Sequence, residues 1–407
     1  MKKFSGILLF PMSLVFLEIA TYLANDMYIP GLPSLAKDFK VSQDIAQYTL
    51  LVWFLGSASM QLITGPLSDR YGRKVILLIG GFLFFLTSLV CALTQDMFTL
   101  LVARFIQGST ICAVVVAGYS AIHELFDTKR AIKIISVMGS VTILAPALGP
   151  LFGAIIIEYT NWRVVFWILT VWGLIASLML LKVMPDTNKH QRVHINIKET
   201  VMDYIKISCR KAFLKHMLPY CLLFMAFIGW IVESPFIIIE TLSKSKIEYG
   251  IIQFMIFGSF LIGAQATRFL IERISGHQTI LVGLSIVTLG TVAMFTMSFM
   301  YEEHLYHVMV GMMVISLGAA IAFGPMNRAA IDACEEPMGR RNAIFSTYMS
   351  VFGVLATFVV TLFNDKTLPN LVAIMSVTFL MAALIYGLST DGIRLLTKSQ
   401  KAFRSRG

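Results

Sequence analysis

Residues 65–74 read GPLSDRYGRK and place one carboxylate and three basic side chains in ten residues, between two long apolar segments. The segments, 44–67 and 75–95, are each close to the roughly 20 residues that an α-helix needs to cross a bilayer. Gly65 permits close helix contact, Asp69 can cap or pair at a helix end, and the bases hold the turn at one membrane surface. The stretch predicts a short turn between two transmembrane helices.

The composition of the whole chain supports a membrane protein. Its 407 residues are 57% hydrophobic and 14% charged, with a mean hydropathy of +0.78. An average soluble domain has about 25% charged residues, so this chain is expected to be integral to a membrane. The net charge of +10 comes from clusters between apolar runs, which predicts membrane topology and not nucleic-acid binding. Twelve apolar segments predict an all-α integral membrane protein with 12 transmembrane helices.

Basic residues are distributed unevenly among the connections. The N-terminus, the even-numbered connections and the C-terminal tail hold 23 lysines and arginines, whereas the odd-numbered connections hold 6. Because basic residues favour the cytoplasmic side, both termini are expected in the cytoplasm. A secretory signal peptide is the alternative interpretation of KKFSGILLF (2–10), but no small-residue cleavage site follows it.

One connection is longer and more polar than the others. Residues 185–215 hold seven lysines and arginines against three acids, which predicts a cytoplasmic linker on the anionic inner leaflet with an amphipathic helix around 197–213. The linker separates an N-terminal six-helix half (1–184) from a C-terminal six-helix half (216–392), and a basic cytoplasmic tail (393–407) follows. Two six-helix halves are typical of transporters built from repeats.

The reactive side chains form no pattern typical of an enzyme. None of the five cysteines falls in an expected external loop, and no cysteine pair has the spacing of zinc ligands. The seven histidines are scattered, without the spacing of a metalloprotease or of a nucleophile with its base. No glycine-rich phosphate loop is present either. We therefore expect no enzymatic activity, no metal and no cofactor.

Two further stretches place unusual residues within apolar segments. LLVARFIQGST (100–110) holds Arg104, and an arginine inside a membrane must find a carboxylate, a carbonyl or water. APALGPLFGA (145–154) combines prolines that remove backbone donors with glycines that permit tight packing. Its residues of interest are Pro146, Gly149, Pro150 and Gly153. This pattern predicts a kinked helix that can act as a hinge or a seal.

The first apolar segment contains two acids. In LEIATYLANDMYIPG (17–31), Glu18, Tyr22 and Asp26 are spaced by four residues and share one helix face, with Asn25 alongside. At about 1.5 Å of rise per residue, the acids lie roughly 12 Å apart along the axis and cannot share one proton. They are expected to be separate protonation sites in one cavity. Each carboxyl is neutral when it is sealed from water and ionised when a cation or water reaches it.

Structural roles are the alternatives for these acids. Asp26 precedes Pro30 by four residues and is alternatively an interfacial residue that ends the helix. Glu18 alternatively pairs with an arginine such as Arg104. In WIVESPFIIIE (230–240), Glu233 stands just before a proline kink whose freed backbone groups can face a cavity. Its alternative is a pair with a partner from the other half, and Glu240 is expected to be interfacial.

These stretches together resemble one known family. GPLSDRYGRK resembles the loop 2–3 signature of the major facilitator superfamily, LLVARFIQG resembles its helix-4 motif, and the pattern of 145–154 resembles the helix-5 motif of its antiporters. With residues 8–31 and 234–240, the chain resembles the drug:proton antiporters of the MdfA type, in the 12-helix group that includes the Bcr/CflA exporters. The resemblance implies the major facilitator fold in two six-helix halves, in a bacterial inner membrane.

The resemblance also implies roles for the residues singled out above. Asp26 becomes the proton and drug site, and Glu18 tunes the recognition of cationic cargo. Glu233 departs from the family, which generally carries a neutral polar residue there, and makes the predicted pocket more negative. The pocket positions are Tyr22, Asn25 and Tyr119. The predicted cytoplasmic gate comprises Gly65, Asp69, Arg70, Gly72, Arg73 and Glu124.

The expected function is therefore proton-coupled efflux of several drugs. Such an antiporter exports lipophilic cationic or neutral compounds by alternating access, and it is expected to work as a monomer with protons, an amphipathic small molecule and the lipid bilayer as its partners. One alternative is a proton-coupled exporter of a specific metabolite or siderophore. A membrane sensor or scaffold that transports nothing is a second alternative, but such a protein has no need of intramembrane acids.

Overall fold

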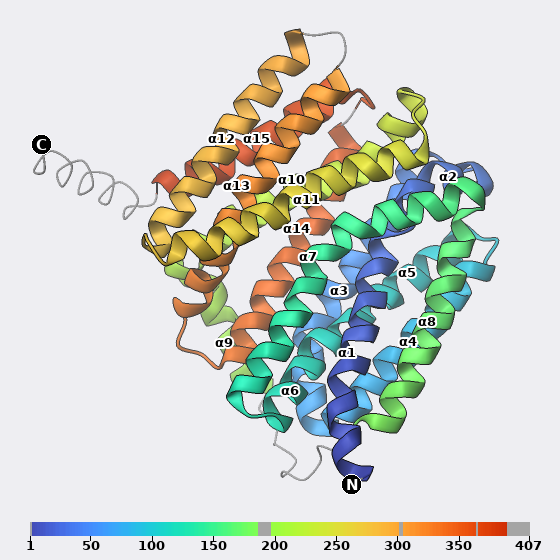
Figure 1. Cartoon of the computed structure of the whole chain (residues 1–407), viewed down its shortest axis with the longest axis vertical. Coiled ribbons are helices and arrows are strands. Elements are labelled where there is room, and N and C mark those ends of the chain that lie inside the picture. The colour runs from blue at the N-terminus through green and yellow to red at the C-terminus, as the bar shows by residue number, and fades with distance from the viewer. Residues whose placement is uncertain (1, 186–196, 301–303, 364, 389–407) are drawn as a thin grey trace, which may run out of the picture.

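The computed structural model describes residues 2–185, 197–300, 304–363 and 365–388, and every regular element within them is a helix (Figure 1). The predicted all-helical fold is therefore confirmed. The first part of the chain forms α1 (Lys2–Asp26), η1 (Ile29–Gly31), α2 (Leu32–Phe39), α3 (Gln43–Tyr71), α4 (Arg73–Leu93), α5 (Met97–Cys112), η2 (Ala113–Gly118), α6 (Tyr119–Leu125), α7 (Thr128–Tyr159) and α8 (Trp162–Val183). The rest forms α9 (Ile197–Cys209), α10 (Lys211–Pro235), η3 (Phe236–Thr241), α11 (Lys246–Ile271), α12 (Gly276–Met300), α13 (His304–Asp332), α14 (Met338–Phe363) and α15 (Leu368–Leu388).

Polar residues at the ends of the connections mark where several helices begin. At α3, α5, α7, α8 and α11 the residue before the helix is Ser, Asp or Asn, and its side chain accepts a backbone N–H of the first turn. Such N-caps satisfy donors that have no partner inside the helix. At α5 the backbone N–H and the hydroxyl of Thr99 donate to Asp96 and hold the pKa of that exposed carboxyl below its usual value.

Ten segments of the described chain are long and apolar enough to cross a membrane. Three helical segments, α5, η2 and α6, join into one of them (Met97–Leu125), and α10 with η3 forms another (Lys211–Thr241). The helices α1 and α7 occupy the other two of the twelve expected positions, and α7 carries the shorter apolar run Leu144–Tyr159. Large apolar side chains lie exposed on the outer faces of the spans, as at Leu86 of α4 and Val171 of α8, which suits contact with lipid.

The spans pack as two groups of six. The helices α1 to α8 contact one another, as do α10 to α15, and the two groups meet mainly where α3 packs on α14 and α7 on α11. Figure 1 shows α4 and α8 on the right and α12, α13 and α15 at the upper left, with α1, α3, α7, α11 and α14 between them. A continuous cluster of buried apolar side chains runs through both groups.

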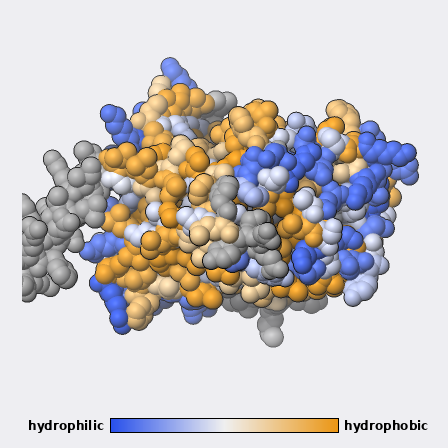
Figure 2. Space-filling view, turned by 90° about the horizontal axis from the view of Figure 1, so that it is seen from above, coloured by the Kyte–Doolittle hydropathy of each residue, from blue (hydrophilic) through white to orange (hydrophobic). Residues whose placement is uncertain are grey.

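The helix bundle has two ends, here named the motif end and the far end. The motif end carries the 65–74 turn, α6 and α9, and the far end carries α2 (Figure 1). Seen from the far end, apolar side chains cover much of the molecule, and hydrophilic ones gather on the side where α2 and α8 lie (Figure 2).

The connection between the two groups contains α9. Residues 186–196 of the predicted linker and the predicted tail 393–407 lie outside the described residues. Tyr204 of α9 donates its hydroxyl to the carbonyl of Leu62 in α3 at 3.2 Å. Arg340 of α14 pairs with Glu199 at 3.1 Å and also with Asp203, so α9 touches both groups at the motif end.

Candidate functional site

The two acids of α1 are both buried, with 0% of Glu18 and 5% of Asp26 exposed. Neither carboxyl forms an ion pair with any residue that the structure describes. Burying an ionised carboxylate without a contacting countercharge is costly, so a proton or a bound cation would stabilise each acid, and at Asp26 the nearby Arg104 also contributes. The predicted pair of intramembrane acids therefore lies where protonation matters.

Glu18 has a tyrosine as its partner. The hydroxyl of Tyr119 donates to Glu18 Oε1 at 2.9 Å, whereas Oε2 is buried with no hydrogen-bond partner among the described residues. Tyr119 is the first residue of α6 and directly follows η2, a π-helical segment that interrupts the span. Such segments are frequent at functional sites. The alternative pairing of Glu18 with Arg104 is not what the structure shows.

Asp26 is the last residue of α1, as its alternative interpretation suggested, but it is buried inside the protein. The chain after it stays buried through Ile29 and the 3₁₀ segment η1, so the helix ends inside the protein. Asn25 donates its side-chain amide to Asp26 Oδ1 at 3.1 Å. Asp26 is therefore both a helix-ending residue and a buried acid.

Arg104 is fully buried beside these residues, and its donors go to neutral oxygens. Nη1 lies 3.0 Å from the carbonyl of Ala24 and 2.6 Å from Gln107 Oε1. Nη2 lies 3.4 Å from Asn25 Oδ1, and the guanidinium stands 4.4 Å from the centre of the Tyr28 ring. Because Asn25 contacts both Arg104 and Asp26, it links the buried cation to the buried acid.

The glycines of the helix-5 motif hold α7 against the end of α1. A Cβ added at Gly149 would stand 2.7 Å from Asp26 Cβ, and one added at Gly153 would stand 1.7 Å from the carbonyl oxygen of Met27. Both distances are too short for a real Cβ. Pro146 and Pro150 lie inside the same helix. The motif therefore fixes the position of Asp26 through close backbone approach.

Glu233 contacts the other group of helices. It is 2% exposed, and Gln47 Nε2 of α3 donates to its Oε2 at 2.5 Å. Thr361 of α14 in turn donates to Gln47 Oε1 at 2.7 Å. Glu233 precedes Pro235 and the π-helical segment η3. A π-helical segment thus lies next to Glu233, as η2 lies next to Tyr119. The alternative interpretation of Glu233 was a pair with a residue of the other half, and in the structure this residue is Gln47.

Glu240 makes a contact that the sequence interpretation missed. It lies 2.8 Å from Lys37 Nζ of α2 and accepts from Gln43 Nε2 of α3 at 2.6 Å, both across the two groups. Lys246 of α11 similarly donates to the carbonyl of Ile157 in α7 at 3.3 Å. The available signal was charge. Lys37 and Glu240 have opposite signs, and both lie in or next to odd-numbered connections, which the distribution of basic residues places on the same side of the membrane.

The predicted gate residues cluster at the motif end. Arg73 lies 2.5 Å from Asp69 and 3.1 Å from Glu124, which joins α3, α4 and α6 through one guanidinium. Gly72 adopts φ +94°, a conformation that side chains disfavour, so the tight turn between α3 and α4 needs glycine. Arg70 lies 5.4 Å from the ring centre of its neighbour Tyr71. All of these contacts lie within the first group of helices.

The remaining predicted positions all lie in the first group of helices. Gly65 faces Val116 of η2, 3.7 Å from where its Cβ would stand. Tyr22 is half-buried against the apolar core on α1, between the two acids in sequence. Asn25 and Tyr119 contact the acids directly, as described above.

The fold and these buried groups define a polytopic helical membrane protein with two six-helix groups. A family model described as the Major Facilitator Superfamily matches residues 14–359. The chain belongs to the Major Facilitator Superfamily.

Relatives are similar over most of the chain. Chloramphenicol resistance protein CraA from Acinetobacter baumannii is 32% identical over 82% of this chain and 80% of its own length. Multidrug transporter MdfA from Yersinia pestis is 31% identical over 91% of each chain. Multidrug resistance protein MdtM from Escherichia coli K12 is 28% identical over 94% of this chain and 95% of its own. The resemblance to the MdfA type is therefore confirmed.

Two solved structures share the fold. Both are crystal structures of a bacterial homologue of the human lysosomal transporter Spinster, with TM-scores of 0.70 and 0.72 and 14% sequence identity. They cover 96% and 94% of this chain and 97% and 96% of their own. This similarity concerns the fold alone and supports the major facilitator fold of 12 transmembrane helices.

Proposed function

We propose that the protein is a proton-coupled multidrug efflux antiporter that exports lipophilic cationic or neutral compounds by alternating access. The observation that carries the proposal is the pair of buried carboxyl groups on α1, which lack any ion pair among the described residues. The relatives named as multidrug transporters and as a chloramphenicol resistance protein support small amphipathic molecules as the cargo.

The proposed exchange takes place on the carboxyl groups. A lone buried carboxylate is costly, whereas the protonated acid and the carboxylate bound to a cation are both tolerated. A proton and a cationic cargo therefore compete for the same group, and release of one permits binding of the other. A difference of one pH unit supplies about 1.4 kcal/mol per proton, enough for roughly a tenfold cargo gradient. This exchange requires no covalent chemistry, and we propose no enzymatic activity.

The site residues have distinct proposed roles. Asp26 is the exchange site, since the motif glycines and Asn25 fix its position next to Arg104. Glu18, held by Tyr119, favours positively charged cargo. Glu233 acts in closing the far end, because its partner Gln47 belongs to the other group of helices. The Asp69, Arg73 and Glu124 cluster serves the gate at the motif end.

The proposed location is a bacterial inner membrane with both termini in the cytoplasm. The excess of basic residues in the N-terminus, the even-numbered connections and the tail supports this orientation. The motif end is then cytoplasmic and the far end external. We propose that a single chain carries out transport as a monomer. Reporter fusions after residues 184 and 407 test the orientation, because both should be active only with cytoplasmic reporters.

The function is tested in proteoliposomes that contain the purified protein. An acid pulse on one side should drive exchange of a fluorescent lipophilic cation, and Asp26→Asn should abolish the proton-driven component. Glu18→Gln should weaken transport of cationic cargo more than that of neutral cargo, because it removes the charge. Asp96→Asn, at an exposed helix start, is the matched control and should transport normally.

Three results would decide between the proposal and its alternatives. Proton-driven exchange that survives Asp26→Asn, Glu18→Gln and Glu233→Gln would exclude exchange on these acids. Transport restricted to one metabolite or siderophore would replace multidrug efflux with specific export. An intact protein with no exchange of any cargo would contradict a transporter.

A further inference from the structure

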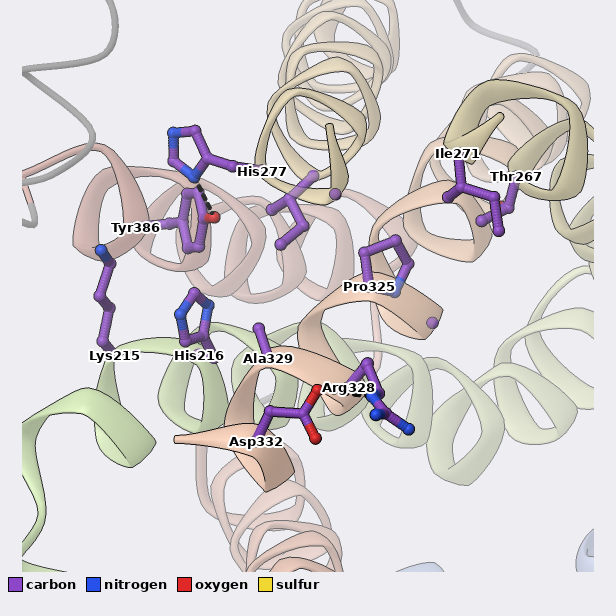
Figure 3. A pocket seen from close by; sticks show the side chains of 13 residues that line it. Lys215, His216, Thr267, Ile271, His277, Pro325, Arg328, Ala329, Asp332 and Tyr386 are labelled. Atoms are coloured by element: carbon purple, nitrogen blue, oxygen red, sulfur yellow. Dashed lines mark hydrogen bonds and ion pairs between the residues drawn. The ribbon is translucent and has the colours of Figure 1, made fainter. Parts of the chain in front are cut away.

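Cargo bound at the acids of α1 needs a surface of the second group that holds its lipophilic part. A cavity of about 840 Å³ lies within the second group at the motif end, where His277 and Tyr386 form part of its wall (Figure 3). None of Glu18, Asp26 and Glu233 lines this cavity. The surface of the second group that meets cargo at these acids therefore lies elsewhere.

One face of α10 points toward the first group. The Phe224 ring lies 6.2 Å from the Phe54 ring of α3, edge to face, so the two groups touch there. Tyr220 lies four residues before Phe224, one helical turn closer to the motif end, and shares its face of the helix. Tyr220 also interacts electrostatically with Tyr22, which lies between the two acids on α1. Tyr220 therefore faces the segment of α1 that carries the acids.

The Tyr220 ring is held by other rings of its own group. Its centre lies 4.3 Å from that of Phe323 in α13 and 4.9 Å from that of Phe345 in α14, in tilted and edge-to-face arrangements. Phe260 of α11 packs on Phe323, with the ring centres 5.8 Å apart. Aromatic pairs in such geometries attract one another. Rings from three other helices thus fix the orientation of Tyr220.

This packing leaves part of Tyr220 available. Tyr220 is half-buried, as is Phe323, whereas Phe345 behind them is 3% exposed. The hydroxyl of Tyr220 has no hydrogen-bond partner among the residues that the structure describes. A hydroxyl inside a protein is seldom left without a partner, because an unsatisfied donor is costly. The ring surface and the hydroxyl are therefore both open to a ligand or to water.

We propose that the aromatic platform formed by Tyr220, Phe323 and Phe345 binds the ring system of an aromatic lipophilic cargo. This inference rests on the efflux proposed above and narrows its cargo to compounds with an aromatic body. A cationic centre of such a compound then faces Glu18 or Asp26 in the opposite group. One bound molecule contacts both groups, so its affinity depends on how they are arranged.

The test compares two cations that differ in their substituents. Tetraphenylphosphonium carries four phenyl rings, whereas tetrabutylphosphonium carries four alkyl chains around the same charged centre. Binding of each cation to the intact, purified protein in detergent is measured by isothermal titration calorimetry. We expect Tyr220→Leu to weaken binding of tetraphenylphosphonium about fivefold, because aromatic pairs contribute beyond their buried area, and that of tetrabutylphosphonium less than about twofold.

Two further variants separate the ring from its hydroxyl and from general packing. Tyr220→Phe keeps the ring and should retain the affinity for tetraphenylphosphonium within about twofold. Phe227→Leu is the matched control on the same helix. Phe227 is 4% exposed and packs on Phe257 and Phe379 inside the second group. This substitution should lower the midpoint of thermal unfolding but leave the preference for the aromatic cation unchanged.

Each outcome has a defined meaning. Selective loss of tetraphenylphosphonium in Tyr220→Leu, with the preference kept in Tyr220→Phe and Phe227→Leu, supports the platform. Equal losses of both cations, or the same selective loss in Phe227→Leu, overturns it. A wild-type protein that binds the aromatic cation no better than the alkyl one also overturns it.

The binding assay separates this inference from the proposed transport. It is carried out without a proton gradient, so failure of the platform and failure of proton-driven exchange are different results. If Tyr220→Leu does not fold, as judged by gel filtration, Tyr220→Met takes its place, because the flexible methionine side chain fills irregular gaps without supplying a ring.

Discussion

At the scale of single residues, the close contact between Gly153 and Met27 predicts that even alanine is not tolerated at position 153. A Cβ at Gly153 would stand 1.7 Å from the Met27 carbonyl oxygen, so Gly153→Ala must push α7 away from α1. Overpacking of this kind costs about 1–3 kcal/mol. We expect a lower midpoint of thermal unfolding in detergent, together with loss of proton-driven transport, because the shift displaces Asp26.

The control for this prediction lies on the same helix. A Cβ at Gly139 of α7 meets nothing within 4 Å, so Gly139→Ala should leave the unfolding midpoint unchanged or raise it, since alanine favours a helix. Equal effects at the two glycines would show that the close approach to α1 is not what the motif provides.

Residues of the candidate site differ in how far the sequence predicted them. Glu18 and Asp26 were identified because an acid inside an apolar segment is rare, which needs no knowledge of packing. Their partners were harder to predict. Tyr119, 101 residues from Glu18, was named only through the family resemblance, and Gln47, 186 residues from Glu233, was not named at all. Such pairs depend on how helices pack, and hydropathy carries no information about that. Gln47 is also an ordinary polar residue near a helix end, so nothing local marked it.

At the scale of elements, α9 is expected to hold the two groups together at the motif end. Arg340 of α14 pairs with Glu199 and Asp203 of α9, and the side chains of Arg340 and Asp203 are 24% and 12% exposed. A partly buried pair of this kind is destabilising to break. We expect Arg340→Gln to speed hydrogen exchange in residues 197–209 and to lower the unfolding midpoint.

A double-mutant cycle measures this contact. Arg340→Gln, Asp203→Asn and the double variant should show a coupling of about 1–2 kcal/mol, because each single substitution removes the same pair. Lys206→Gln is the control, since its ammonium lies 3.7 Å from Asp203 and is largely exposed. Additive effects of the two substitutions would mean that α9 is held by its apolar face alone.

Helix positions were largely predictable from the sequence, but irregular segments were not. Apolar length and the Ser, Asp and Asn residues before several helices mark where the spans begin. The π-helical segments η2 and η3 had no such signal. Pro235 predicted a kink, and the structure resolves it as a widened turn; AVVVAG (113–118) contains no proline and reads as ordinary apolar helix. The shape of those turns depends on neighbours such as Leu14, which packs on Gly118.

At the scale of the whole molecule, polar side chains of the facing spans join the two groups at the far end, whereas α9 touches both groups at the motif end. Glu240 pairs with Lys37 and Gln43, and Glu233 with Gln47, so acids of the second group bind polar residues of the first. The acidic cluster at the motif end instead stays within one group. This asymmetry is what a state closed at the far end requires, and alternating access needs a second state in which these contacts break.

Breaking the far-end contacts should therefore shift the balance between the two states. We expect Glu240→Gln combined with Gln47→Ala to lower the ratio of closed to open molecules about fivefold to thirtyfold, because lost hydrogen bonds and an ion pair are worth about 1–2 kcal/mol. Spin labels at positions 40 and 244, one in each group, report the change in double electron–electron resonance as a longer distance between the two labels. Asp38→Asn is the matched control, because Asp38 is also a far-end carboxylate but accepts from Trp162 Nε1 at 2.8 Å within its own group. Unchanged distances in the double variant, or equal changes in the control, would mean that apolar packing of α7 on α11 keeps the far end closed.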